Sequence, residues 1–466
     1  MTTQQKYDAI VIGASSAAVS RLCPTLAQAG WKTALIEREH VGGTCVNVGC
    51  MPTKTLVASA RVAYVARRAA DYGANTAPVT VDMARVQQRK QDVVKGLRSF
   101  AEDLVERAEG VDLFRGEASF TDPKSVEVRL NGGGVRQLTA DTILIDTGAR
   151  PSKPSIPGLD SVPTLDSTSI MELDILPEHL LILGGGYVGV EFSQMFRRFG
   201  SQVTIVQSRK QLLVREDPDV AEEVANILRE DGIEVLLEAN AIKAEQTAND
   251  GIQLLVNTPE EEGRTLTGSH LLAATGRVPR TERLNLAAAS VKTDESGAIQ
   301  VNERLETSAP GVYAMGDVKG EPAFTHVAYN DYYILRTNLL ERGNATTRSR
   351  VVPNTTFIDP QLGRVGLTET EARAQGRNIR VARLPMAMVL RAIDVGETRG
   401  FMKAVVDADT DQILGAVVLG IEGGEIMSML QLAMMGNLPY TALRDGMFSH
   451  PTLAESLNTL FMAMDS

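Results

Sequence analysis

The hydrophobic pattern of the chain shows one unit twice. Each unit has an apolar run, a turn led by glycine, a helical pattern and a second apolar run. The first unit runs from YDAIVIG at residue 7 to TALIE at residues 33–37, and the second from HLLILGGG at residues 179–186 to QVTIVQ at residues 202–207. This succession is typical of the βαβ unit of a dinucleotide-binding fold. The sequence therefore predicts two Rossmann-like domains in an α/β protein.

The remaining patterns extend these two units and then depart from them. Residues 82–109 carry apolar positions at helical spacing among many charges, which predicts a long helix. The stretches DTILIDTGARP at 141–151 and HLLAATGRVP at 270–279 read as a strand followed by a turn and close the two units. After about residue 351, strands and helices follow without a glycine-rich turn, which predicts a separate α+β domain.

Composition and charge exclude several classes of protein. The chain has 466 residues, too many for a single core, and 43% of them are hydrophobic. Its net charge of −11 disfavours nucleic acid or an anionic membrane as the main partner. No apolar run reaches the roughly 20 residues of a membrane span, and the N-terminal residues have no signal-peptide pattern. We therefore expect a cytoplasmic protein without a nucleic-acid or membrane partner.

The second glycine-rich turn is complete. Gly184, Gly186 and Gly189 form G-x-G-x-x-G directly after an apolar strand, where the backbone can approach a pyrophosphate at a helix N-terminus. The next strand ends in Gln207, where an acidic residue would bind the ribose of NAD, and Arg209 and Lys210 follow. Two cations without an acid suit a 2′-phosphate and favour NADPH, although NADH stays possible. The alternative is a solvated basic turn.

The first glycine-rich turn is altered. Gly13 is present, but Ser15 and Ala18 stand where the second and third glycines belong. Glu37 ends the following strand and could bind an adenosine ribose. Pro24 falls inside the expected helix and predicts a kink there.

Two of the three cysteines lie close together in GGTCVNVGCMPTK, residues 42–54. Cys45 and Cys50 could close a small disulfide on the first turn of a helix, where the N-terminus lowers the pKa of a thiol. A zinc site would need two more nitrogen or sulfur ligands, and only Cys23 and five scattered histidines remain. We expect no metal site. Near the C-terminus, His450 precedes Glu455 by five residues, and this pair could be a general acid and base or purely structural.

Taken together, these motifs resemble the flavoprotein pyridine nucleotide-disulfide oxidoreductases, which include glutathione reductase, dihydrolipoamide dehydrogenase and mercuric reductase. The resemblance covers nearly the whole chain, and its C-terminal stretch RDGMFSHPTLAESLNTLF looks most like the mercuric-reductase-like branch. It implies FAD at the first unit, NAD(P)H at the second and a homodimer. The implied domains are residues 1–150 and 277–345 for FAD, 151–276 for NAD(P)H and 346–466 for dimerisation.

The resemblance also implies roles for individual residues. Cys45 would meet the substrate and Cys50 would contact the flavin, with Lys54 and Glu191 paired beside it. His450 and Glu455 would serve the active site of the other subunit. Further residues implied to bind a cofactor are Gly43, Thr44, Thr147, Gly148, Gly276, Arg277, Gly316, Asp317, His326 and Ala328.

Three functions remain open from the sequence. In the first, electrons pass from NADPH through FAD to the Cys45–Cys50 disulfide and on to a small thiol or disulfide substrate. In the second, the same thiols serve a metal-ion reductase acting on Hg(II) or Cu(II). In the third, the altered Gly13 turn belongs to a non-catalytic flavoprotein. The His450–Glu455 pair favours the first function, and the mercuric-reductase-like branch favours the second.

Overall fold

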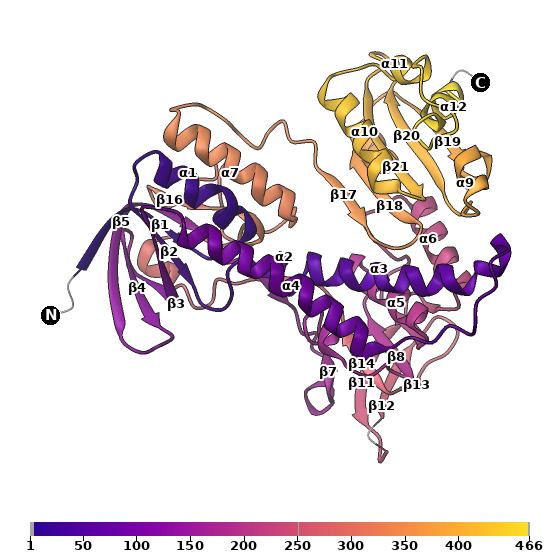
Figure 1. Cartoon of the computed structure of the whole chain (residues 1–466), viewed down its shortest axis with the longest axis horizontal. Helices are drawn as coiled ribbons and strands as arrows, with labels where there is room; N and C mark the ends of the chain where they lie inside the picture. Colours follow the sequence, from indigo (N-terminus) through magenta and orange to yellow (C-terminus); the bar gives the residue numbers. More distant parts are fainter. Residues whose placement is uncertain (1–3, 250, 465–466) are drawn as a thin grey trace.

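The computed structural model describes residues 4–249 and 251–464, which form three units around separate sheets. Figure 1 shows the N-terminal sheet on the left, the second sheet at the lower right and the C-terminal unit at the upper right. Two long helices, α3 (Cys50–Arg67) and α4 (Met83–Glu106), extend from the first unit to the second. The long helix expected over residues 82–109 is α4.

The first sheet is built around β1, which pairs parallel with both β2 and β5. Ile10 and Ile12 pack into one core and Ala9 and Val11 into another, and all four are at most 3% exposed. A parallel strand covered on both faces is apolar, which explains the unbroken apolar run AIVI at residues 9–12. The strands of this sheet are β1 (Gln4–Ile12), β2 (Thr33–Glu37), β3 (Val111–Asp122), β4 (Ser125–Leu130), β5 (Val135–Ile145) and β16 (Val312–Ala314).

The helix after the first glycine-rich turn changes its winding near Pro24. Residues Ala18–Leu22 form a π-helical turn, and α1 (Cys23–Gln28) follows with Pro24 in its first turn. Proline is tolerated there because it lacks only an N–H that would have no partner. A single π-turn accommodates an irregularity within a helix, so the expected kink takes the form of a change in helical pitch.

The second sheet is parallel throughout and contains the complete glycine-rich turn. Its order is β10 (Glu234–Leu236), β9 (Gln202–Val206), β8 (His179–Leu183), β14 (His270–Ala273) and β7 (Thr164–Leu165). Helices α5 (Tyr187–Phe199) and α6 (Pro218–Glu230) pack against it, and β11 (Asn240–Gln246), β12 (Ile252–Asn257) and β13 (Arg264–Gly268) form an antiparallel layer. A short ribbon of β6 (Ala149–Pro151) and β15 (Arg277–Pro279) joins the two units.

The third unit has an antiparallel sheet in the order β17 (Pro353–Thr356), β18 (Gln361–Gly366), β21 (Ile413–Gly420), β20 (Phe401–Asp407) and β19 (Ile379–Pro385). Its helices are α8 (Glu369–Ala374), α9 (Leu390–Asp394), α10 (Gly423–Met435), α11 (Tyr440–Arg444) and α12 (Ser456–Met462). Helix α7 (Thr325–Leu340) leads into it from the first unit. The predicted fold class, two Rossmann-like units and a C-terminal α+β domain, is confirmed. Among the described helices, none is long and apolar enough to span a membrane.

Candidate functional site

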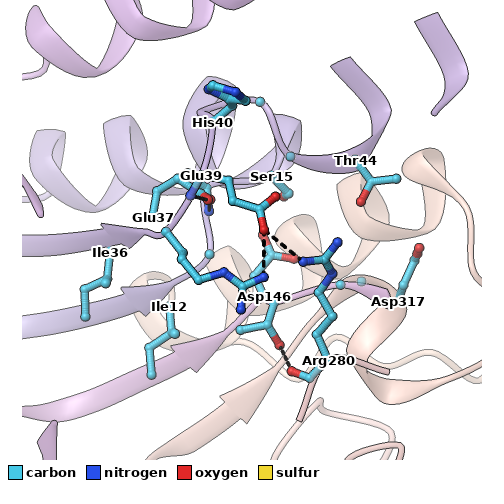
Figure 2. A pocket seen from close by; sticks show the side chains of 18 of the residues that line it. Ile12, Ser15, Ile36, Glu37, Glu39, His40, Thr44, Asp146, Arg280 and Asp317 are labelled. Atoms are coloured by element: carbon cyan, nitrogen blue, oxygen red, sulfur yellow. Dashed lines mark hydrogen bonds and ion pairs between the residues drawn. The ribbon is translucent and has the colours of Figure 1, made fainter. Parts of the chain in front are cut away.

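A cavity of about 440 Å³ opens at the carboxyl ends of the parallel strands in the first sheet. Ligands in open α/β folds bind at this edge, because the loops that follow the strands meet there. Figure 2 shows the side chains that line it, contributed by the ends of β1, β2 and β5 and by later loops. The predicted site residues that line it are Gly13, Ser15, Glu37, Gly43, Thr44, Cys45, Thr147, Gly148, Gly316, Asp317 and Ala328.

The two glycine-rich turns begin with the same backbone geometry. Gly13 has φ +105°, and a Cβ there would lie 2.2 Å from the Asp146 carbonyl oxygen. Gly184 has φ +104°, and its Cβ would lie 2.5 Å from the Ala274 carbonyl oxygen. Only glycine fits such positions. The first turn therefore keeps the tight bend of a dinucleotide site despite its altered sequence.

Glu37 is held at the end of β2 by two backbone donors. Its Oε2 accepts from the Ala14 N–H at 3.0 Å and its Oε1 from the Glu39 N–H at 2.7 Å. These bonds fix the carboxylate at the cavity rim, where a ribose hydroxyl could donate to it.

The opposite side of the cavity is formed by the turn after β16. The Gly316 N–H donates to Asp331 Oδ2 at 2.8 Å, and Asp331 is also paired with Lys319 and Arg350. These bonds hold the neighbouring Asp317, whose pKa is raised mainly because it is buried.

Cys45 lines this cavity, and Cys50 lies beside it, in contact with the lining residue Thr325. Cys45 lies in α2 (Gly43–Asn47) and Cys50 is the first residue of α3, so the expectation that both share the first turn of one helix is wrong. The helical backbone is interrupted between them at Gly49, whose φ of −140° and ψ of −113° are not helical. Both are free thiols.

Cys50 is the more acidic of the two thiols. A hydrogen bond from Cys45 lowers the pKa of Cys50 to about 6, with smaller contributions from Thr325 and from the positive charge of Lys54. The Thr325 hydroxyl lies 3.5 Å from the Cys50 sulfur. The same contact raises the pKa of Cys45, because it stabilises the protonated form of that thiol. The arrangement therefore favours a thiolate at Cys50 and a thiol at Cys45.

One ion pair near the thiols joins the first two units. Lys54 Nζ on α3 lies 2.7 Å from Glu191 Oε2 on α5, as the resemblance implied. Glu191 is buried, and its Oε1 accepts from the Phe357 N–H at 2.8 Å. This network joins α3, helix α5 after the second glycine-rich turn, and the segment after β17 in the third unit.

The second glycine-rich turn lies outside the cavity. A Cβ at Gly186 would meet nothing within 4 Å, whereas one at Gly189 would lie 2.0 Å from the Gly184 carbonyl oxygen. Gln207 is buried and donates to the Gln211 carbonyl at 2.9 Å. Arg209 and Lys210 are exposed, and neither has an ion-pair partner among the described residues.

Several predicted residues are not brought to the cavity. His326 stacks on Phe324 and bonds to the Pro353 carbonyl at 2.9 Å. Arg277 is the first residue of β15 and donates to the Ala149 carbonyl at 2.6 Å, and Gly276 directly precedes the strand. His450 and Glu455 lie between α11 and α12 in the third unit and do not line the cavity.

The predicted acid–base pair is formed within the chain. His450 Nδ1 lies 2.9 Å and 3.1 Å from the two carboxylate oxygens of Glu455. The His450 side chain is 67% exposed, so its second ring nitrogen can reach a group outside this unit.

Asp146 and Arg280 are among the residues lining the cavity that were missed from the sequence. Asp146 directly follows β5 beside the Gly13 turn, and its position after the apolar run TILI could have identified it. Arg280 reaches the rim from β15 and lies 3.4 Å from Glu39. Arg280 directly follows GRVP, and nothing in that sequence pattern indicates that its side chain lies in the first unit.

The fold, the paired glycine-rich turns and the adjacent thiols together define a flavoprotein disulfide reductase. Residues 7–331 match the family described as pyridine nucleotide-disulphide oxidoreductase, and residues 352–461 match the dimerisation domain of that family. The chain belongs to the pyridine nucleotide-disulfide oxidoreductase family. It is therefore an oxidoreductase that uses FAD and a pyridine nucleotide, and it carries the dimerisation domain of that family.

Individual relatives agree with this assignment. The chain is 40% identical to the probable pyridine nucleotide-disulfide oxidoreductase RclA of Escherichia coli K12, over 98% of this chain and 99% of the relative. It is 36% identical to mercuric reductase of Staphylococcus aureus, over 98% of this chain and 82% of the relative. The solved Cu(II) complex of the HOCl-induced flavoprotein disulfide reductase RclA from E. coli superposes with a TM-score of 0.89 at 40% identity, over 98% of this chain and 99% of that chain.

Proposed function

We propose that this protein is a homodimeric NADPH-dependent reductase in which Cys45 and Cys50 form the redox-active pair. The observation that supports the proposal is the contact between Cys45, which lines the dinucleotide cavity, and Cys50. This contact raises the pKa of Cys45 and lowers the pKa of Cys50. A thiolate next to a protonated thiol can take part in thiol–disulfide exchange.

The cavity fits FAD. Gly13 leaves room where a Cβ could not, Glu37 presents an oriented carboxylate for a ribose, and Asp317 faces the cavity from the other side. When bound, FAD supplies a two-electron carrier between the nucleotide and the thiols.

Residues of the chain carry out the remaining chemistry. Cys45, deprotonated by a base, attacks one sulfur of the substrate disulfide, and the first substrate thiolate leaves and takes up that proton. The Cys50 thiolate then attacks the Cys45 sulfur, which forms the Cys45–Cys50 disulfide and releases the second substrate thiolate. Lys54, held by Glu191, keeps a positive charge near Cys50 throughout. The substrate disulfide is reduced by two electrons as the thiol pair is oxidised.

We assign the proton transfer to His450 of the partner subunit. Within its own chain His450 does not line the cavity, yet it is exposed and oriented by Glu455. The match to the family's dimerisation domain supports a second copy as the partner that brings this imidazole to the thiols.

NADPH is the nucleotide that the second unit suits. Arg209 and Lys210 are exposed after β9, and Gln207 stands where a carboxylate would otherwise hold a 2′-hydroxyl. In steady-state turnover, kcat/KM for NADPH should exceed kcat/KM for NADH.

A second candidate function is reduction of a metal ion by the same thiols. The similarity to mercuric reductases and to a disulfide reductase solved as a Cu(II) complex favours it. Thiolates bind soft ions such as Hg(II) and the Cu(I) that forms when Cu(II) is reduced, so the substrate would be Hg(II) or Cu(II).

The experiment is an anaerobic titration with NADPH followed by turnover with a panel of small disulfides, Hg(II) and Cu(II). NADPH should bleach the flavin absorbance, and a long-wavelength thiolate–flavin absorbance should appear. Cys45→Ser should keep that absorbance and lose turnover, whereas Cys50→Ser should lose both. Cys23→Ser is the matched control, because Cys23 is buried away from the pair. Full turnover by Cys45→Ser with every acceptor would overturn the proposal, and failure of NADPH to bleach the flavin would indicate a non-catalytic flavoprotein.

A further inference from the structure

Asp146 is a buried carboxyl group in the cavity that the proposed chemistry does not use. It follows the last residue of β5, is 5% exposed and lines the cavity beside the Gly13 turn. Its Oδ2 is buried and has no hydrogen-bond partner among the described residues. A buried polar atom without a partner is rare in a protein, and in a ligand cavity it indicates a contact that the ligand completes.

Among the described residues, no cation is one of the main charged influences on Asp146. The charged groups that face it are Glu37, Asp317 and Asp331, all of them acidic. The cations Lys319 and Arg350 nearby are paired with Asp331. Burial, together with these like charges, raises the pKa of Asp146 well above its usual value. Burial and the neighbouring acids favour the protonated carboxyl group, which has one proton to donate, whereas the hydrogen bond with Ser15 acts in the opposite direction on the pKa.

Ser15 connects this acid to the altered turn. The Ser15 hydroxyl accepts a hydrogen bond from the Ala18 N–H at 3.2 Å and interacts with the Asp146 carboxyl. At the matching position of the other turn, Gly186 has open space in place of a side chain. Ser15 and Asp146 therefore place polar side chains beside the first turn, where the second turn has only backbone.

We propose that Asp146 binds the FAD cofactor as a neutral acid, donating a hydrogen bond from its carboxyl group to an oxygen of the phosphate–ribityl segment. Ser15 positions it. An ionised carboxylate would repel the phosphates, so the proton is what makes the position compatible with an anionic ligand. The inference rests on the proposed function only in that the cavity holds FAD.

The test is FAD binding to the apoprotein, measured by quenching of flavin fluorescence. Asp146→Asn keeps a donor of similar shape and should leave the Kd for FAD within about threefold, whereas Asp146→Leu should weaken binding at least about tenfold, the effect of about one lost hydrogen bond. Asp141→Asn, an exposed position within the same strand β5, is the matched control and should not change the Kd. Infrared spectra of the wild-type apoprotein at neutral pH should contain a protonated-carboxyl band that Asp146→Asn removes.

The outcomes are separable. If Asp146→Asn weakens FAD binding as much as Asp146→Leu, or if the infrared band is absent, an ionised carboxylate is present and the inference is wrong. If both variants bind FAD as the wild type does, Asp146 makes no contact with the cofactor. If the wild-type apoprotein itself binds no FAD, the proposed function fails instead. Thermal melting of each apoprotein shows whether a variant is folded, and the infrared measurement needs no variant to bind.

Discussion

The different acidities of two neighbouring thiols follow from their positions. Cys45 donates to Cys50, and Thr325 and Lys54 add a hydroxyl and a positive charge on the Cys50 side. Since the donated hydrogen bond is the largest of these contributions, the acidity of Cys50 belongs to the pair and not to either residue alone.

This leads to a prediction for the pH dependence of Cys50. Its pKa is lowered, so the thiolate is present above about pH 6 and is lost as the pH falls through that value. Cys45→Ser keeps a hydroxyl donor and should leave the pKa of Cys50 low, whereas Cys45→Ala should move it toward the ordinary thiol value of about 8.5. Ultraviolet thiolate absorbance measured against pH reports both, and Cys50→Ser should abolish the transition. Identical pKa values in the two Cys45 variants would contradict this account.

At the scale of elements, the two glycine-rich turns use their glycines for different purposes. Gly189 on α5 is needed because the helix lies against the turn, with a Cβ only 2.0 Å from the Gly184 carbonyl oxygen. Gly186 has no protein neighbour to avoid, so its missing side chain leaves space for a nucleotide. The first turn does not follow this distinction, because it keeps Gly13 but has Ser15 at the counterpart of Gly186 and Ala18 at the counterpart of Gly189.

A pair of alanine substitutions separates these two purposes. Gly189→Ala should destabilise the NADPH unit by about 1–3 kcal/mol, because the added methyl overlaps backbone atoms. Gly186→Ala should change stability by less than about 0.5 kcal/mol but weaken NADPH binding at least about tenfold. Thermal unfolding and calorimetric titration with NADPH measure the two effects. A stable Gly189→Ala protein, or a Gly186→Ala protein with unchanged NADPH affinity, would show that the turn does not work this way.

At the scale of the whole molecule, the third unit presents an apolar surface. Leu432, Met435 and Met447 are 67%, 60% and 100% exposed, and Val62 on α3 is 69% exposed. Large exposed apolar side chains of this kind can be covered by contact with another chain. Because the unit matches a dimerisation domain, we expect a second copy to cover them and to bring His450 to the thiols of its partner.

Mixing two inactive variants tests this arrangement. We expect Cys45→Ser and His450→Gln homodimers to lose at least about a hundredfold in disulfide reduction. After exchange of subunits, a mixed dimer has one site with both Cys45 and His450 intact. A random mixture should therefore recover about one quarter of wild-type activity, since half the dimers are mixed and each has one working site.

The control for this experiment is a mixture of Cys45→Ser with Cys50→Ser. Both cysteines of a site come from one chain, so this mixture should stay inactive. Mixed dimers that are demonstrated by sedimentation but remain inactive in the first mixture would place His450 in the site of its own chain.

Local patterns in the sequence were sufficient for the elements and for most of the cavity. An apolar strand followed by a glycine that must adopt a positive φ defines a tight turn through neighbouring residues alone, and Gly13, Gly184 and the strand ending at Glu37 were predicted in this way. The two cysteines were found for the same reason, because they are close in the chain. Their placement on two helices was not predicted, because a pattern of hydrophobic residues does not indicate that the helix is interrupted at Gly49.

Only the tertiary structure decided what depends on burial and on strands that are distant in sequence. The Lys54–Glu191 pair spans 137 positions; its residues were expected from resemblance, but its place at the junction of three units was not. In the sequence Asp146 is the polar residue after a strand, and it is a buried acid in the structure because the end of β2, the turn after β16 and helix α7 bring Glu37, Asp317 and Asp331 near it. The pKa of a carboxyl group depends on the solvent and charges that surround it in space, and no local run of residues contains that information.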